Sequence, residues 1–187
     1  MRDVYYRRVG LFASASEASL WVHRLCTVVG LPRHALGFSG CPRGEVVGPL
    51  TFRDPHRYEM VRVGELRQGE TLPLGSMAHR WTRVDTGGAR FVLVCEKHAT
   101  FTGLVAAGFH KSAVNGVGAA LIVTGKGYPD TYTSAAVARL CIRESLPTFI
   151  LADADPSGLE IAMTYKWGGA SAFREEGSYG YSKAITT

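Results

Sequence analysis

Three short apolar runs in the second half of the chain constrain its fold most. They are FVLVC at 91–95, AALIVTG at 119–125 and TFILAD at 148–153, each suited to a strand buried on both faces. Segments with helical periodicity lie between them, and SGLEIAMTYK, which begins like an N-capped helix, follows the third run. Because strands and helices alternate, we predict an α/β fold with a parallel sheet and crossover helices.

The first half of the chain shows other patterns. Ser14 to Glu17 has the S-x-x-E form of a helix capping box, and apolar residues at helical spacing follow it, so we predict a helix over 15–29. The glycine-punctuated stretch 37–52 predicts a small wing or hairpin. The stretch 53–90 mixes β-like pieces with turn residues, which indicates short strands and loops at a domain junction.

Arginine carries the basic charge of the chain, and it is concentrated in the first half. Residues 1–90 hold 13 Arg and no Lys against 8 Asp and Glu, a net charge of +5, whereas residues 91–187 hold 8 basic and 8 acidic residues. Guanidinium groups match phosphate oxygens, so a polyanionic partner fits, although a solubilising surface explains the same charge. The four cysteines form no CxxC pair, and no apolar run is long enough to span a bilayer, so we expect neither a zinc site nor a membrane partner.

Acidic residues follow two of the predicted strands. Glu96 comes directly after the first strand, Asp153 closes the third, and Asp155 lies two residues later. In an open parallel sheet ligands collect at the carboxyl ends of the strands, and like charges gather there only when a cation or a proton intervenes. Carboxylate oxygens favour Mg²⁺. The alternative is that Glu96 caps a helix and the two aspartates form a turn.

Two further segments point to phosphate chemistry. TGKGYPD at 124–130 places Lys126 between two glycines, which suits close approach of an anion, although the segment is not a P-loop. RDVYYRR near the start places Tyr5 and Tyr6 among arginines. A phenol is a poor nucleophile at neutral pH unless its pKa is lowered, and nearby cations have that effect. Taken alone, such an aromatic pair is more often a packing feature.

Together these segments resemble the A subunit of type IIB DNA topoisomerase (topoisomerase VI) and its eukaryotic relative, the meiotic double-strand-break transesterase. RDVYYRRVGLF resembles the active-site segment of that family and slightly favours the meiotic branch over the archaeal one. LPRHALGFSGCPRGEVVGPLTF is similar to the following part of its winged-helix domain. VCEKHATFTGL, LIVTGKGYPD and LADADPSGLEIAMTYKWG match the toprim metal fold. His98 departs from the pattern, since an acid often stands there.

The resemblance implies three regions. Residues 1–52 form a partial winged-helix (CAP-like) segment with the catalytic tyrosine, residues 53–90 a junction, and residues 91–187 a toprim domain that is incomplete at its C-terminus. The family has a long segment before the tyrosine and continues well beyond the last helix, so we expect a chain truncated at both ends.

The resemblance also implies a chemistry, that of a type IIB (ATP-hydrolysing)-like DNA topoisomerase, an isomerase and transesterase. Tyr6 is the expected nucleophile, and it becomes joined to the 5′ end of the broken DNA strand. Glu96, Asp153 and Asp155 are the expected Mg²⁺ ligands. The expected phosphate contacts are Arg2, Arg7, Arg8, Arg43 and Lys126.

The expected partners are double-stranded DNA, a second copy or a full-length homologue, and a topoisomerase VI B-like subunit that carries the ATPase. A eukaryotic chain of this kind belongs in the nucleus, and a prokaryotic one in the cytoplasm with the nucleoid. Two alternatives stay open. One is a non-cleaving DNA-binding chain or dimer partner. The other is a haloacid dehalogenase-type phosphatase, in which an aspartate of a DxD motif attacks phosphate, but here the DxD follows the third strand and not an early one.

Overall fold

The computed structural model describes residues 5–6, 8–31, 36–38, 41–54, 58–67, 70–75, 78–111 and 116–167. These residues belong to two compact units, the first ending at residue 41 and the second starting at residue 42. Within the described ranges, no helix is long and apolar enough to cross a bilayer.

The described part of the first unit consists mainly of helix α2 (Ala15–Val29), which the short 3-10 turn η1 (Val9–Leu11) precedes. The predicted N-cap is confirmed, because Ser14 Oγ accepts the Glu17 N–H at 3.1 Å. Glu17 also reaches back, but its Oε2 accepts the N–H of Ala13 at 2.6 Å, one residue before the N-cap. At the other end Gly30 has φ +69° and donates its N–H to Cys26 O. Only glycine adopts this left-handed conformation without strain, so the helix ends there.

Helix α2 buries the face that carries its smaller apolar residues, and its largest apolar residues are exposed. Ala18, Val22 and Cys26, at four-residue spacing, are buried, whereas Trp21 is 50% exposed and Val28 is 85% exposed. The predicted helix is therefore confirmed, but its most apolar stripe faces away from the packed side. The described residues of this unit do not show a winged-helix domain, and that part of the fold remains a prediction.

The centre of the second unit is a five-stranded mixed sheet in the order β4-β1-β7-β6-β8. Its strands are β1 (Glu45–Val47), β4 (Leu72–Pro73), β6 (Phe91–Cys95), β7 (Ala120–Thr124) and β8 (Thr148–Leu151). Strand β6 pairs in parallel with β7 and with β8, which confirms the predicted parallel arrangement of these three strands. Strand β1 runs antiparallel to β4 and β7, so the whole sheet is mixed.

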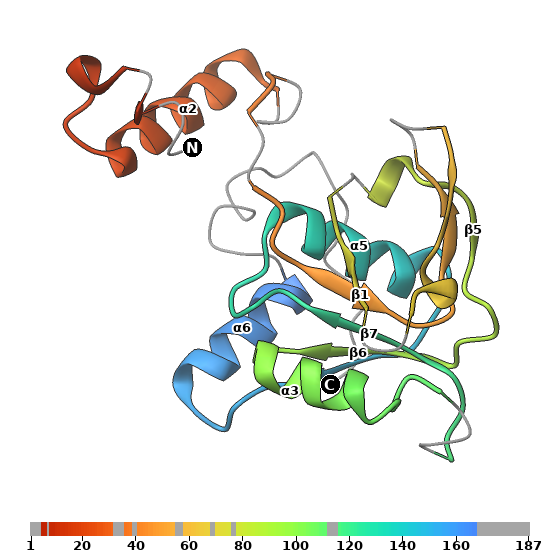
Figure 1. Ribbon diagram of the computed structural model, residues 1–187. Helices are drawn as coiled ribbons and strands as arrows, with labels where there is room; N and C mark the ends of the chain where they lie inside the picture. Colours follow the sequence, from red (N-terminus) through yellow and green to blue (C-terminus); the bar gives the residue numbers. More distant parts are fainter. Residues whose placement is uncertain are drawn as a thin grey trace. The chain divides into compact units, whose positions relative to one another are not determined.

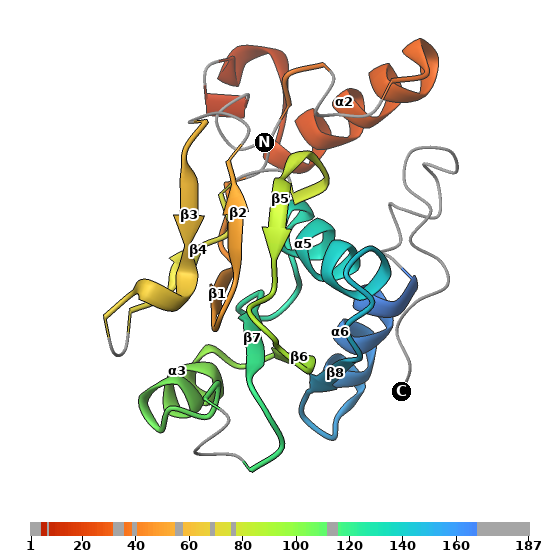
Figure 2. The ribbon, with the colours of Figure 1, turned by 90° about the vertical axis from the view of Figure 1, so that its right-hand side faces the viewer.

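Helices in the described part of the second unit cover both faces of this sheet. Helix α3 (His98–Ala106) lies on one face, and α5 (Thr131–Ile142) and α6 (Pro156–Trp167) lie on the other (Figures 1 and 2). Alternate residues of β6 follow the same division, because Val92 and Val94 pack in the cluster with α5 and α6, whereas Cys95 packs with Phe101 of α3. Burial on both faces explains why the strands read as continuous apolar runs.

Strand β1 overturns the predicted wing or hairpin at 37–52. It pairs with β7 and β4, whereas the next strand, β2 (Thr51–Arg53), pairs with β3 (Met60–Arg62) and β5 (Thr82–Asp85) in a separate three-stranded sheet. The physical reason is that Val46 and Val47 are both buried, one toward each face of the central sheet. A solvent-exposed wing buries only one face of a strand.

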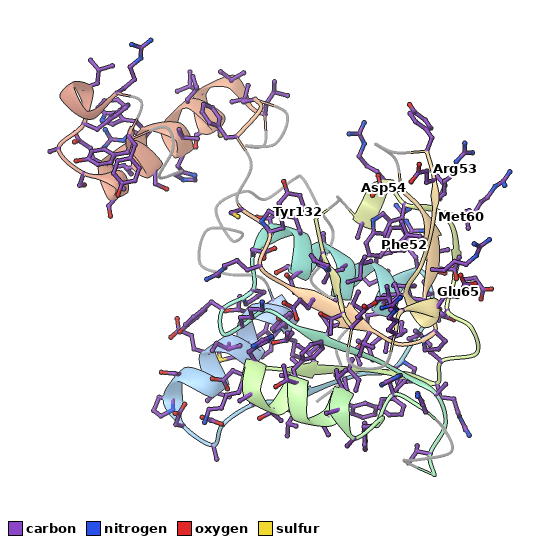
Figure 3. The ribbon with its side chains drawn as sticks, viewed as in Figure 1. Phe52, Arg53, Asp54, Met60, Glu65 and Tyr132 are labelled. Carbon is purple, nitrogen blue, oxygen red and sulfur yellow. The ribbon has the colours of Figure 1, made fainter. Side chains whose placement is uncertain are left out.

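The three-stranded sheet packs through an aromatic pair. Phe52 is 2% exposed and stacks on Trp81 with ring centroids 4.0 Å apart, and Figure 3 shows Phe52 and Arg53 on opposite sides of their strand. The 3-10 turns η2 (Val63–Glu65) and η3 (Ala78–Arg80) complete this region. Whether residues 53–90 are a domain junction stays a prediction.

Asp130 joins the start of α5 to the segment that leads into β1. Its Oδ1 accepts the Thr133 N–H at 2.9 Å as an N-cap, and its Oδ2 accepts the Arg43 N–H at 2.7 Å and the Gly44 N–H at 3.2 Å. Gly44 must be glycine, because a Cβ there would lie 2.0 Å from Thr133 Oγ1. One carboxylate thus satisfies three backbone donors from two distant parts of the sequence.

We predict that Asp130→Ala lowers the free energy of unfolding by about 2–4 kcal/mol, since it removes a helix cap and leaves the partly buried Gly44 N–H and the exposed Arg43 N–H without this acceptor. Asp85→Ala is the matched control, because Asp85 accepts one exposed N–H, that of Gly87. We expect it to cost less than about 1 kcal/mol. Equilibrium urea unfolding measures both, and equal losses in the two variants would contradict this role of Asp130.

We also predict that Cys95 reacts slowly with iodoacetamide in the native protein. Its side chain is fully buried beneath α3, and burial raises the pKa of its thiol to about 11, so little thiolate exists at pH 8. The exposed Cys41 serves as the internal comparison. Mass spectrometry after a timed reaction distinguishes the two sites, and equal labelling would show that the packing of Cys95 is wrong.

Candidate metal centre and nucleic-acid interface

The structure brings the carboxyl ends of β6 and β8 to one edge of the sheet. The two strands are neighbours in parallel register, with Cys95 opposite Leu151, and the Glu96 N–H extends the pairing to Leu151 O at 3.0 Å. Glu96 follows β6 directly, and Asp153 lies two residues beyond the end of β8. The predicted meeting of these strand ends is confirmed.

Glu96 and Asp153 are in direct contact. Glu96 Oε2 accepts the backbone N–H of Asp153 at 2.9 Å, and both residues are half-buried. The N-cap residue of α3 is Lys97 and not Glu96, and the Lys97 side chain makes no capping hydrogen bond. The carboxylate of Glu96 is therefore held toward β8 and not toward its own following helix.

Lys97 supplies positive charge to this edge. Its Nζ lies 2.5 Å from Asp153 Oδ2. The hydrogen bond and the charge of Asp153 raise the pKa of the Lys97 ammonium, and the charges of Glu96 and Asp155 raise it further. All three predicted acids therefore act electrostatically on the same ammonium group.

Asp155 has a structural task as well. Its Oδ1 accepts the Gly158 N–H at 2.7 Å, and its carbonyl accepts the Leu159 N–H at 3.0 Å, which is the N-cap geometry of α6. Gly158 is buried against the same edge, where a Cβ would lie 2.2 Å from Asp153 O. The turn that the sequence offered as an alternative thus exists, and it coexists with the gathering of the acids.

The donor set at this edge fits a hard divalent cation. Carboxylate oxygens from Glu96, Asp153 and Asp155 are of the type that Mg²⁺ prefers, and a cationic ammonium already contacts one of them. In the described part of the chain, no three His, Cys, Asp or Glu side chains are arranged ready to hold a metal ion. The structure thus brings Glu96 and Asp153 into contact at this edge without closing a ligand set.

The loop after β7 borders the same edge. The Gly127 N–H donates to Glu96 O at 3.0 Å, and Lys126, the residue before it, adopts the left-handed conformation with φ +56°. The side chain of Lys126 pairs with Glu45 of β1, with Nζ 2.5 Å from Oε1. Lys126, a predicted phosphate contact, therefore has an internal carboxylate partner.

The remaining predicted phosphate contacts are arginines from both units. Arg43 is exposed and belongs to the second unit, where its guanidinium donates to Tyr128 O at 3.0 Å. Arg8 is exposed in the first unit. Arg2 and Arg7 lie outside the described residues.

Tyr6, the predicted nucleophile, is 67% exposed in the first unit, and its ring lies 5.4 Å from that of Tyr5 at 57°. The acids lie in the second unit. An exposed phenol is accessible to a large substrate.

Sequence reasoning missed two carboxylates near this edge. Glu45 lies on β1, and its proximity to Lys126 depends on the pairing of β1 with β7, for which the local sequence gives no signal. Glu160 of α6 accepts the Tyr128 hydroxyl at 2.7 Å. That bond, together with slight desolvation and the charges of Glu160 and Glu96, raises the pKa of the exposed Tyr128 phenol.

Comparison with known proteins agrees with this arrangement. A family model for the toprim domain of the topoisomerase 6 A-subunit/Spo11 proteins matches residues 91–184, and a model described as "Type IIB DNA topoisomerase" matches residues 1–38.

Individual relatives cover most of the chain. The meiotic recombination protein spo-11 of Caenorhabditis elegans is 30% identical over 93% of this chain and 38% of its own length. The meiotic recombination protein SPO11 of Mus musculus is 31% identical over 91% of this chain and 41% of its own length. The DNA topoisomerase 6 A3 subunit of Oryza sativa subsp. indica is 31% identical over 89% of this chain and 36% of its own length.

This chain therefore spans about two fifths of the length of these relatives. The toprim match covers the sheet edge where the acids meet, and the second match covers the segment with Tyr6. The resemblance first read from the motifs is confirmed, and the chain belongs to the topoisomerase 6 A-subunit/Spo11 family.

Proposed function

We propose that this chain takes part in cleaving double-stranded DNA by Mg²⁺-dependent transesterification, as in the initiation of meiotic recombination or the action of a type IIB topoisomerase. The sheet edge at which Glu96 accepts the Asp153 N–H and Lys97 pairs with Asp153 supports this proposal most directly. Family membership and the names of the relatives agree with it.

Tyr6 is the proposed nucleophile. Its phenol oxygen attacks a DNA phosphorus, so that a new O–P bond forms while the bond from phosphorus to the 3′ oxygen breaks. The phenol proton leaves to solvent, the 3′ oxygen takes up a proton, and the 5′ end stays joined to the protein as a phosphotyrosyl ester. One ester replaces another, so the step itself consumes no ATP.

Glu96, Asp153 and Asp155 are the proposed magnesium ligands. A bound Mg²⁺ supplies positive charge that stabilises the phosphate oxygens and the leaving 3′ oxygen. Lys97 holds Asp153 in place at this edge, and the Asp153 amide orients the Glu96 carboxylate. Both contacts fix the position of these carboxylates at the edge where the cation would bind.

The basic residues bind the DNA backbone in this proposal. Exposed Arg8 and Arg43, together with Lys126, contact phosphates, as do Arg2 and Arg7. Such contacts fix the position of the duplex and carry no base information. We therefore expect affinity to depend on salt more than on DNA sequence.

The proposed partners follow from the two-strand nature of the reaction. One chain cuts one strand, so a second copy or a full-length homologue is needed for the other. A topoisomerase VI B-like subunit supplies the ATPase, and a eukaryotic chain would act in the nucleus.

The alternative, a non-cleaving DNA-binding chain or dimer partner, predicts a different result. DNA that is bound without any covalent product would support this second role. Family membership disfavours the phosphatase.

We predict that Tyr6→Phe reduces the covalent protein–DNA product to background, because nothing replaces the attacking oxygen. Purified chain is incubated with end-labelled duplex DNA and Mg²⁺, denatured, and the adduct is quantified on a gel. Tyr5→Phe is the matched control and should retain the adduct. An unchanged adduct in the Tyr6 variant assigns the nucleophile to another residue.

We further predict that Glu96→Gln weakens Mn²⁺ or Mg²⁺ binding at least about tenfold, since it removes one anionic ligand. Isothermal titration calorimetry measures this without any cleavage. Glu65→Gln is the control, because Glu65 is exposed and pairs with Arg62 at 3.5 Å, far from β6 in the sequence. Equal affinities in the two variants would rule Glu96 out as a ligand.

A further inference from the structure

The carboxylate of Glu45 contacts side chains from three other parts of the second unit. Its Oε1 lies 2.5 Å from Lys126 Nζ, in the loop after β7. Its Oε2 accepts the Thr71 hydroxyl at 3.0 Å and lies 3.3 Å from Nε2 of His98, the first residue of α3. A single acid thus links β1, the start of α3, the β7–α5 loop and the residue before β4.

Glu45 is ionised at neutral pH. Partial burial raises the pKa of its carboxyl, but hydrogen bonds from Lys126, Thr71 and His98 outweigh burial, and the pKa lies below its usual value. Its side chain is only 18% exposed, so solvent screens it less than a surface acid. The negative charge of Glu45 therefore offsets the positive charge of Lys126.

The backbone around Lys126 limits where its ammonium can go. Its N–H donates to Thr124 Oγ1 at 3.1 Å, and its φ of +56° is a left-handed conformation that a residue with a side chain rarely adopts. The N–H of the next residue, Gly127, donates a hydrogen bond to Glu96 O at 3.0 Å. These two hydrogen bonds hold the backbone on either side of the Lys126 side chain. From this backbone position the Lys126 ammonium reaches the Glu45 carboxylate.

We propose that Glu45 is an internal competitor of the DNA phosphate for Lys126. This inference rests on the proposed DNA-binding function. A phosphate that contacts Lys126 must displace the Glu45 carboxylate from the ammonium or share the ammonium with it. Glu45 therefore weakens the binding of this loop to DNA. The residue acts through Lys126 and touches no reacting atom, so it tunes binding and takes no part in the chemistry.

A purely structural role predicts a different outcome. If Glu45 only ties β1 to the loop, its removal loosens the loop and leaves DNA binding unchanged or weaker. Glu45→Gln separates the two roles, because the amide keeps the shape and one acceptor oxygen, for either Lys126 or Thr71, but loses the charge.

The first experiment measures DNA binding in the full chain by fluorescence anisotropy, with a short duplex, without Mg²⁺ and over a series of KCl concentrations. We expect Glu45→Gln to tighten binding about two- to fivefold, the range of a partly exposed ion pair. The slope of log affinity against log salt should steepen by about 0.9, as one more phosphate contact requires. Glu59→Gln is the control, because it removes one exposed negative charge elsewhere in the same unit.

The double variant decides whether Lys126 is the route. In a Lys126→Met background, Glu45→Gln should no longer tighten binding. If Glu45→Gln tightened DNA binding equally with and without Lys126, or if Glu59→Gln tightened it equally, the effect would come from the change in net charge alone. Either result would overturn the proposal. Weaker binding by Glu45→Gln would overturn it as well.

A second readout needs no DNA. Brief acylation with an N-hydroxysuccinimide ester, followed by peptide mass spectrometry, should label Lys126 several-fold faster in Glu45→Gln than in the wild type, with Lys111 unchanged as the exposed comparison. If neither the wild type nor any variant binds DNA, the proposed function fails. The labelling rate alone then tests whether Glu45 restrains Lys126. Unchanged labelling of Lys126 would then contradict the restraint by Glu45.

Discussion

The parallel pairing of β6 with β8 is the constraint on which the candidate site depends. Parallel strands end at the same edge of a sheet, so the residues that follow Cys95 and Leu151 must lie side by side. The core secures this register, because both faces of β6 are packed, one by α5 and α6 and the other by α3. A slip of one residue would exchange the two faces and expose Val92 and Val94 to the wrong helix.

Acids gathered by such a register must be compensated, and this unit does so with local donors. Glu96 accepts the Asp153 amide, Asp153 pairs with Lys97, and Asp155 caps α6. The same principle recurs elsewhere in the sheet, where Glu45 and Lys126 offset each other. These contacts offset part of the negative charge that the carboxylates bring to one edge of the sheet.

Periodicity and capping patterns were sufficient to predict much of this architecture. Helix α2 begins and ends where the capping box and Gly30 predict, and β6 coincides with the run FVLVC. These signals are local, since each needs only a few neighbouring residues. The position of β1 is not local, because its partner β7 follows more than 70 residues later, and the predicted wing was therefore wrong. Glu45 was missed for the same reason, whereas Glu96 and Asp153 were found because strand ends predict their meeting.

The central claim is that Glu96, Asp153 and Asp155 share one divalent ion. Anomalous diffraction from crystals of the chain grown with Mn²⁺ tests this most directly, because the signal locates the ion without reference to activity. We expect one anomalous peak at the carboxyl ends of β6 and β8, with oxygens of these three residues in its coordination shell. Full Mn²⁺ occupancy elsewhere, with these carboxylates still bound only to Lys97 and backbone amides, would contradict the claim.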